Sequence, residues 1–354
     1  MNPLNEAELA EMVASAKGPV EIIGGGTRQI GEKLAGEPLY TKALTGVTLY
    51  EPEALTLVAR AGTPVAEIEA LLAKNNQHLP FEPMDYRALQ GSEGEPTIGG
   101  MVATNASGPR RISALACRDS LIGVRFVDGM GNVIKNGGRV MKNVTGYDLV
   151  KLMAGSHGTL GVLTEVSFKL LPAARATASV LVAQDEAGAA ETMARALGSP
   201  YDISGAGHIA GTTALRLEGL AGSVAYRAEA LAKLLGGTVG EFDWQALRDV
   251  VAFAGKPGDV WRFSVRPSDG PALAKALRGL GAEEVILDWA GGLLWALAPA
   301  GTDLRAGLVS GHATVVRGSA RPVFQPESTA IAALSAGLRQ RFDPRNILNT
   351  GRMG

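Results

Sequence analysis

Apolar and polar positions alternate along the first half of the chain in short segments with two different periods. Apolar residues recur every three to four positions over residues 5–16 and 63–76, a spacing that predicts amphipathic helices. A short helix is predicted at 147–154 and a polar, turn-rich loop at 81–94. Short apolar runs between turn residues predict strands at 20–23, 48–50, 55–61, 124–127, 133–134 and 162–169.

After Pro172 the segments become shorter and richer in alanine. Strands are predicted at 178–183, 203–210, 213–217, 260–266, 284–288, 293–298 and 313–317, and helices at 186–197, 223–235, 243–253, 271–280 and 302–308. Strands and helices that alternate over one sheet predict an α+β cap with ferredoxin-like halves. We therefore expect an α+β protein with three parts: residues 1–172, a cap of residues 173–325, and an anchored tail of residues 326–354.

The strand at 20–23 runs directly into Gly24, Gly25 and Gly26, and such a strand-to-glycine loop can cradle a phosphate. A dinucleotide-binding GxGxxG fingerprint is the rival interpretation. It would need glycine at position 29, where the chain has Gln29, followed by a strongly apolar helix that the pattern does not predict.

A second glycine-rich segment, TIGGMVATNASG, covers residues 97–108. Glycines let a backbone approach a ligand closely, and small polar side chains offer hydrogen bonds to it. The residues of these two kinds are Gly99, Gly100 and Gly108, and Thr104, Asn105 and Ser107. A helix start packed against a sheet is the alternative, and the residues alone leave both interpretations open.

Together with KNVTGYDLVKLMAGSHGTLG at 142–161 and the strand after it, this segment resembles the FAD-binding domain of the vanillyl-alcohol oxidase family of flavoproteins. IIGGGTRQIG at 22–31 is similar to that family's pyrophosphate loop, and RFDPRNILNTG at 341–351 is similar to its C-terminal signature. The resemblance implies a PCMH-type FAD-binding domain of two α/β subdomains, with a cap domain and a C-terminal segment that returns to the FAD domain.

The same resemblance assigns cofactor contacts to residues in two glycine loops, in one glycine turn and in the tail, and to Pro83 between the two loops. These residues are Gly24, Gly25, Gly26, Thr27, Pro83, Thr97, Gly99, Gly100, Thr104, Asn105, Ser107, Gly108, Gly158, Thr159, Gly161, Val162 and Asn349. His157 stands where the family commonly has Glu. A substitution that tunes the site is one interpretation, and a neutral surface change is the favoured one.

Relatives in this family often tether the flavin through a His in the first loop or a Cys beside the second. The first loop here has no His, and Glu95 stands at the position of the second tether. Cys117 lies further along and is interpreted as a small buried residue. We therefore predict dissociable, non-covalent FAD.

In related 2-hydroxyacid dehydrogenases the cap carries a histidine-rich turn that helps to hold a metal and the substrate. The corresponding segment here, 288–295, reads DWAGGLLW, so no metal site is predicted. His208 and His312 lack ligand spacing and are interpreted as structural, and the predicted role of Trp289 and Trp295 is core filling rather than lining a cleft.

No catalytic residue is identified, and the weak candidates are Arg262 and Arg266. Four residues apart in a predicted strand, they would lie on one face and could pair with a substrate carboxylate, although solvated strand-face charges are the favoured alternative. A general base for a hydroxyl proton does not stand out among His78, His157, His208 and His312.

Composition narrows the partners. The 354 residues carry 34 Lys and Arg against 35 Asp and Glu, so the net charge of −1 gives no global reason to expect nucleic acid or an anionic membrane as a partner. The single cysteine excludes an internal disulfide and cannot supply an iron-sulfur cluster. The N-terminus does not resemble a secretory signal, and residues 290–300 are too short to span a bilayer, so we expect a cytoplasmic protein, with any membrane association peripheral at the inner face.

Within the family the resemblance is strongest to flavoprotein subunits of bacterial glycolate oxidase. It implies an FAD-binding subunit that works beside a paralogous flavoprotein and an iron-sulfur subunit in oxidising glycolate, a small 2-hydroxy acid, to glyoxylate. Two alternatives stay open: a self-sufficient FAD-dependent 2-hydroxyacid dehydrogenase, and an assembly subunit without a redox role. The degenerate cap turn favours the last of these, whereas the intact cofactor loops oppose it.

Overall fold

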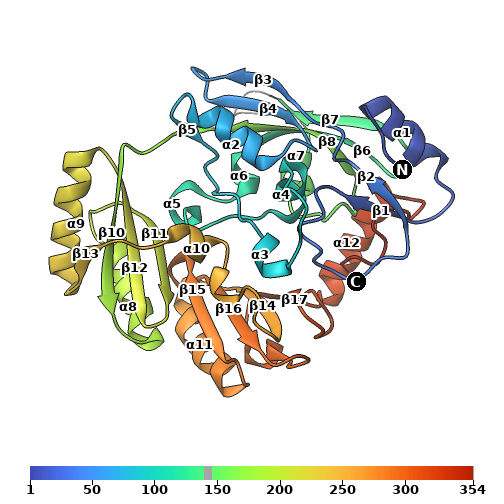
Figure 1. Cartoon of the computed structure of the whole chain (residues 1–354). Helices are drawn as coiled ribbons and strands as arrows, with labels where there is room; N and C mark the ends of the chain where they lie inside the picture. The colour runs from blue at the N-terminus through green and yellow to red at the C-terminus, as the bar shows by residue number, and fades with distance from the viewer. Residues whose placement is uncertain (139–145, 354) are drawn as a thin grey trace.

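A computed structural model describes residues 1–138 and 146–353 (Figure 1). Lys142 and Asn143, which belong to one of the family-like segments, lie outside the described residues.

The first 172 residues build two subdomains from short elements. These are α1 (Glu6–Ser15), β1 (Val20–Ile23), β2 (Glu37–Tyr40), β3 (Val47–Glu51), β4 (Thr56–Arg60), α2 (Val65–Ala73), β5 (Gln77–His78), α3 (Arg87–Gln90), α4 (Ile98–Thr104), α5 (Arg111–Ala114), α6 (Cys117–Ser120), β6 (Leu121–Val127), β7 (Val133–Gly137), α7 (Leu149–Met153), β8 (Val162–Lys169) and β9 (Leu171–Pro172). β1 and β2 pair in parallel, and five strands form an antiparallel sheet in the order β3-β4-β8-β6-β7. The central strand β8 is buried over most of its length, which explains its nearly continuous apolar sequence.

The cap forms one eight-stranded antiparallel sheet from two halves. Its elements are β10 (Ala176–Ala183), α8 (Glu186–Leu197), β11 (Ile203–Ile209), β12 (Thr212–Gly219), α9 (Ala221–Leu235), β13 (Thr238–Gly240), α10 (Trp244–Arg248), η1 (Val251–Phe253), β14 (Asp259–Ser264), η2 (Pro267–Asp269), α11 (Gly270–Gly279), β15 (Glu284–Asp288), η3 (Trp289–Gly291), β16 (Leu293–Ala298), η4 (Leu304–Gly307) and β17 (His312–Arg317).

The strand order β13-β10-β12-β11-β15-β16-β14-β17 confirms the predicted ferredoxin-like halves. Numbered within each half, the strands read 4-1-3-2 and then 2-3-1-4, so the halves meet through their second strands. Their junction is a single register pair, His208 opposite Leu287. The second half replaces one of its two helices by the short 3₁₀ turn η4.

One face of this sheet meets the N-terminal part of the molecule. Arg262 on β14 lies directly opposite Trp295 on β16, so both side chains belong to the same face. The ring of Trp295 contacts that of Tyr86 in the N-terminal part, with centroids 6.2 Å apart. In the first half of the sheet, Arg216 on β12 forms an ion pair with Glu82 of the N-terminal part.

The tail consists of α12 (Thr329–Phe342) and an irregular segment that returns to the start of the chain. Leu348 forms a parallel bridge with Val20 of β1, and the Gly129 N–H donates to the Phe342 carbonyl. Figure 1 shows α12 and the C-terminus beside β1 and β2. Residues more than 300 positions apart therefore share one small core.

Several predicted elements need correction. The predicted polar loop 81–94 contains α3 and buries Phe81, Met84, Tyr86 and Leu89, because the cap covers it. The predicted helix 243–253 breaks at Val250, where φ is +53°, and the predicted helix 302–308 is only η4. β2, β13 and α12 were not predicted from the sequence.

Candidate functional site

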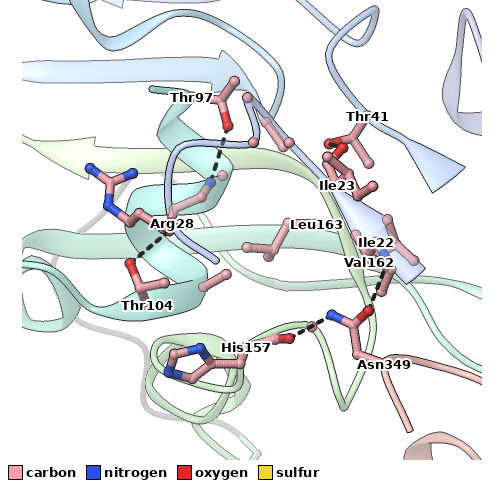
Figure 2. A pocket seen from close by; sticks show the side chains of 18 of the residues that line it. Ile22, Ile23, Arg28, Thr41, Thr97, Thr104, His157, Val162, Leu163 and Asn349 are labelled. Carbon is pink, nitrogen blue, oxygen red and sulfur yellow. Dashed lines mark hydrogen bonds between the residues drawn. The ribbon is translucent and has the colours of Figure 1, made fainter. Parts of the chain in front are cut away.

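A cleft in the N-terminal part gathers segments that are far apart in the sequence. It encloses about 950 Å³, some of it open to solvent, between the loop after β1, helix α4, the turn before β8 and the tail. We call it the glycine cleft (Figure 2).

The loop after β1 supplies backbone donors. Within the described part of the chain, the N–H groups of residues 25–28 donate to no protein acceptor. Gly26 has a φ of +72° and open space where a Cβ would lie, whereas a Cβ on Gly25 would overlap the Glu95 carbonyl oxygen. Successive free N–H groups in such a turn form a concave site for anionic oxygens, of the kind that a pyrophosphate needs.

Helix α4 forms a second wall. Thr97 caps the helix by accepting from the Gly100 N–H, and the Thr104 hydroxyl donates to the Gly100 carbonyl at 2.8 Å. A Cβ on Gly99 would lie 2.8 Å from the Ala61 carbonyl oxygen, so this glycine lets the helix press against β4. The helix packed against a sheet, one of the two alternatives from the sequence, is therefore confirmed, and the same helix lines the cleft.

The tail closes the cleft through Asn349. Its Oδ1 accepts from the Ile22 N–H at 2.8 Å, and its Nδ2 donates to the His157 carbonyl at 2.7 Å. Figure 2 shows this side chain between the two segments. Gly158, with a φ of +74°, passes so close to Asn349 that a Cβ would lie 2.7 Å from Nδ2. Asn349 therefore joins the two walls.

His157 lies in the cleft, so its interpretation as a surface substitution was wrong. Its ring meets Phe324 edge-on at 5.0 Å between centroids, and the backbone N–H of His157 donates to the Ala103 carbonyl. Burial, helped by the positive charge of Arg352, lowers the pKa of His157 to about 4. The imidazole is neutral at physiological pH.

Most of the predicted cofactor residues line the cleft. These are Gly24, Gly25, Gly26, Thr27, Thr97, Gly99, Gly100, Thr104, Gly158, Gly161, Val162 and Asn349. The exceptions are Pro83, Asn105, Ser107, Gly108 and Thr159.

The exceptions serve the protein itself. Asn105 ends α4 with a φ of +47° and accepts from the Arg118 N–H, and Ser107 accepts from the Cys117 N–H. The Thr159 hydroxyl donates to the Ser156 carbonyl, and the Gly108 carbonyl accepts from Trp289. Pro83 is buried away from the cleft lining.

Sequence reasoning missed two arginines that line the cleft. Arg28 is half-buried, donates to the Met84 carbonyl, and lies 5.3 Å from the centre of the Tyr86 ring, while its buried Nε has no partner among the described residues. Burial lowers the pKa of Arg28. Arg352 pairs with Glu21 at 2.9 Å. Arg28 directly follows the glycine loop and Arg352 directly follows the NTG turn, and this adjacency is the only signal that could have found them.

The two predicted arginine candidates lie apart. β14 ends at Ser264, not at Arg266, and the Arg266 side chain is 77% exposed and paired with Asp269 at 3.1 Å. Arg262 faces the N-terminal part, 5.2 Å from the centre of the Trp289 ring. Trp289 and Trp295 are both buried, and the Trp289 Nε1 donates to the Gly108 carbonyl at 3.0 Å. Both tryptophans thus help to form the contact between the cap and the N-terminal part.

The structural interpretation holds for one of the two cap histidines. His208 is buried and bonded to the Thr213 hydroxyl, but His312 is exposed at the start of β17, so the interpretation was wrong for His312. Cys117 is wholly buried, which raises the pKa of its thiol. The described residues include no cluster of three or more His, Cys, Asp or Glu placed to hold a metal ion. Across the same residues, no helix combines the length and apolar character needed to cross a bilayer.

Comparisons with known proteins show the family and the fold of the chain. The FAD binding domain family matches residues 1–137. The chain is 38% identical to glycolate oxidase subunit GlcE of Escherichia coli K12, over 98% of this chain and 95% of that protein. It is 32% identical to glycolate oxidase subunit GlcD of Bacillus subtilis over 48% of this chain and 36% of that protein. A solved alkyldihydroxyacetonephosphate synthase shares the fold, with a TM-score of 0.71 at 14% identity, covering 99% of this chain and 76% of that one.

Proposed function

The chain belongs to the FAD-binding flavoprotein family that includes glycolate oxidase subunit GlcE, and we propose that it is the corresponding FAD-binding subunit of a glycolate oxidase. In this role it works with a paralogous flavoprotein subunit and an iron-sulfur subunit to oxidise glycolate to glyoxylate. An iron-sulfur centre has to sit on a partner, because this chain has one cysteine and that residue is buried.

The observation that carries the proposal is the set of free backbone N–H groups at residues 25–28 in a cleft of about 950 Å³. They fit the pyrophosphate of FAD, while the glycine turn at 158–161 and α4 would hold the remainder of the cofactor. Bound FAD supplies an electron acceptor for oxidation of a CH–OH group. The chain's own residues bind and orient it, and Asn349 and His157 keep the tail folded over the cleft.

We propose that the FAD is not covalently bound. No cysteine is among the described residues that line the cleft, and Cys117 is sealed in the core. His157 is the histidine that lines the cleft, and its ring packs edge-on against Phe324. Among the described residues, no cysteine thiol is therefore accessible in the cleft to form a covalent bond to the flavin.

The test is the visible spectrum of the purified chain under anaerobic conditions. We expect the absorbance of oxidised flavin, released into the supernatant on acid precipitation. With the partner subunits present, glycolate should bleach it. Bleaching of the isolated chain by glycolate would instead support a self-sufficient dehydrogenase, and a chain that binds no FAD at all would support an assembly role without redox chemistry.

A glycine variant links the flavin to the cleft. Gly158→Ala places a Cβ 2.7 Å from Asn349 Nδ2 at a φ of +74°, so we expect a lower flavin-to-protein ratio. Gly255→Ala in the cap is the matched control, because its φ is +68° but nothing lies within 4 Å of the new Cβ. Equal loss of flavin in both variants would contradict the assignment of the cleft.

A further inference from the structure

Two arginines from different parts of the chain meet at one tryptophan. Arg111, at the start of α5 in the N-terminal part, lies 4.2 Å from the centre of the Trp289 ring. Arg262, on β14 of the cap, lies 5.2 Å from the same centre. We call Arg111 and Arg262 the arginine pair.

Neither guanidinium of the arginine pair has an acceptor among the residues that the structure describes. Among the described residues, no hydrogen bond or ion pair is made by either side chain, although each is partly buried. Burial lowers the pKa of both arginines, and the charge of Arg262 lowers that of Arg111 further. Two positive charges held close together repel each other, and a bound anion would relieve this repulsion.

Two acidic side chains act on the arginine pair without forming an ion pair: the charge of Asp119 raises the pKa of Arg111, and that of Asp288 raises the pKa of Arg262. Asp288 lies on the same face of the cap sheet as Arg262, but its Oδ1 already accepts from the Trp289 N–H at 2.7 Å. Burial raises the pKa of Asp288 to about 7, so it is not a permanent carboxylate. No carboxylate oxygen of the described residues lies within ion-pair distance of either arginine.

A series of side-chain contacts leads from the glycine cleft to the cap strand that carries Arg262. Arg28 lines the cleft and stacks over Tyr86, and Tyr86 in turn contacts Trp295, the cross-strand partner of Arg262. The indole of Trp289 gives a flat apolar surface beside the two charges. An anion held here would sit between the cofactor cleft and the cap.

We propose that Arg111 and Arg262 together bind the carboxylate of a small 2-hydroxy acid or its 2-oxo product at the junction of the N-terminal part and the cap. Planar guanidinium groups match the two oxygens of a carboxylate. The identity of the acid rests on the proposed function, whereas the need for an anion rests on the two unpaired charges. Because the two arginines come from different parts, a bound acid also bridges them.

The test measures binding of glycolate and of oxalate to the purified full chain by quenching of tryptophan fluorescence, with glycolamide as the uncharged analogue. We expect saturable quenching by both acids and at least tenfold weaker binding in Arg262→Gln and in Arg111→Gln. Arg262→Lys should lose less, because it keeps the charge. Arg278→Gln is the control, since Arg278 is an exposed cap arginine that is paired with Glu186.

Two results would overturn the proposal: equal affinity for glycolate in Arg262→Gln and the parent, or glycolamide binding as tightly as glycolate in the parent. The second comparison needs no variant, so misfolding of an arginine variant cannot mask the answer. Flavin content is measured on the same samples. Loss of flavin with carboxylate binding intact would contradict the proposed function alone, and intact flavin without carboxylate binding would contradict this inference alone.

Discussion

The two halves of the cap sheet touch the N-terminal part in opposite ways. In the first half, Arg216 lies 2.7 Å from Glu82 and 3.7 Å from Glu218, and Arg110 lies 2.6 Å from Glu218. In the second half, both members of the arginine pair contact the Trp289 ring, and no carboxylate of the described residues lies within ion-pair distance of them. The same residue type therefore holds the parts together at one end and leaves charge unbalanced at the other.

This difference separates a structural contact from a binding contact. Burial would raise the pKa of Glu82, but Arg216 and Arg110 bring it below the usual value, so the ionised network is favoured in the folded chain. For the arginine pair burial prevails: the charge of Asp119 raises the pKa of Arg111 and that of Asp288 raises the pKa of Arg262, but each pKa stays below its ordinary value. The first half has the features of a permanent fastening, and the second has the features of a site that awaits a ligand.

The largest expected effect breaks the fastening. Glu82→Gln leaves the buried Arg216 without its closest anion, and we expect a loss of about 3–5 kcal/mol in the free energy of unfolding. Denaturant unfolding at pH 7 measures it. A loss below about 1 kcal/mol would mean that Glu218 alone balances Arg216 and that the two halves differ less than their geometry suggests.

Asp288→Asn tests the other half through its pH dependence. The folded carboxyl keeps its proton to about pH 7, whereas an unfolded Asp releases it near 3.8. The free energy of unfolding of the parent protein therefore falls as the pH rises from about 4 to 7, and the loss caused by Asp288 is constant above that range. The variant should equal the parent at pH 4 and exceed it by roughly 2–4 kcal/mol at pH 8. A pH-independent difference between the two proteins would contradict this.

Trp289→Phe keeps a ring for the arginine pair but removes the hydrogen bond to the Gly108 carbonyl. We expect a loss of about 1 kcal/mol in stability, because a buried acceptor loses its partner. Thermal unfolding checks it, with Trp295→Phe as a matched substitution whose ring also meets the N-terminal part. No loss of stability would show that this bond does not fasten the second half.

The smallest expected effect is the most telling for the comparison. Arg262→Gln removes a half-buried cation that has no ion-pair partner among the described residues, so the free energy of unfolding should change by less than about 0.5 kcal/mol or rise. Arg216→Gln at the other half should cost several times more. Equal losses in unfolding measurements would show that Arg262 has a structural partner after all.

Much of the fold follows from local pattern. β8 and α8 were predicted with their observed bounds, because each couples a clear period with a clear end. α12 was missed for a physical reason: it buries no residue, and Ile331, Leu334 and Leu338 face outward, so no core-facing stripe marks it.

The site was predictable where backbone shape carries the signal. The glycine loops and Asn349 lie in the cleft as expected from the family resemblance. Side-chain direction was not predictable, since Asn105 and Ser107 turn to neighbouring backbone N–H groups instead. Arg266 was placed on a strand that ends at Ser264, and it precedes Pro267, outside the β14 ladder.

The two hydrogen bonds of the Asn349 side chain also set an order of events during biosynthesis. The glycine loop and α4 leave the ribosome early, but the side chain that joins Ile22 to His157 is made more than 320 residues after Ile22. A nascent chain can therefore fold its sheets while the cofactor cleft still lacks its closing residue. The two hydrogen bonds of Asn349 can close the cleft only after residue 349 has left the ribosome.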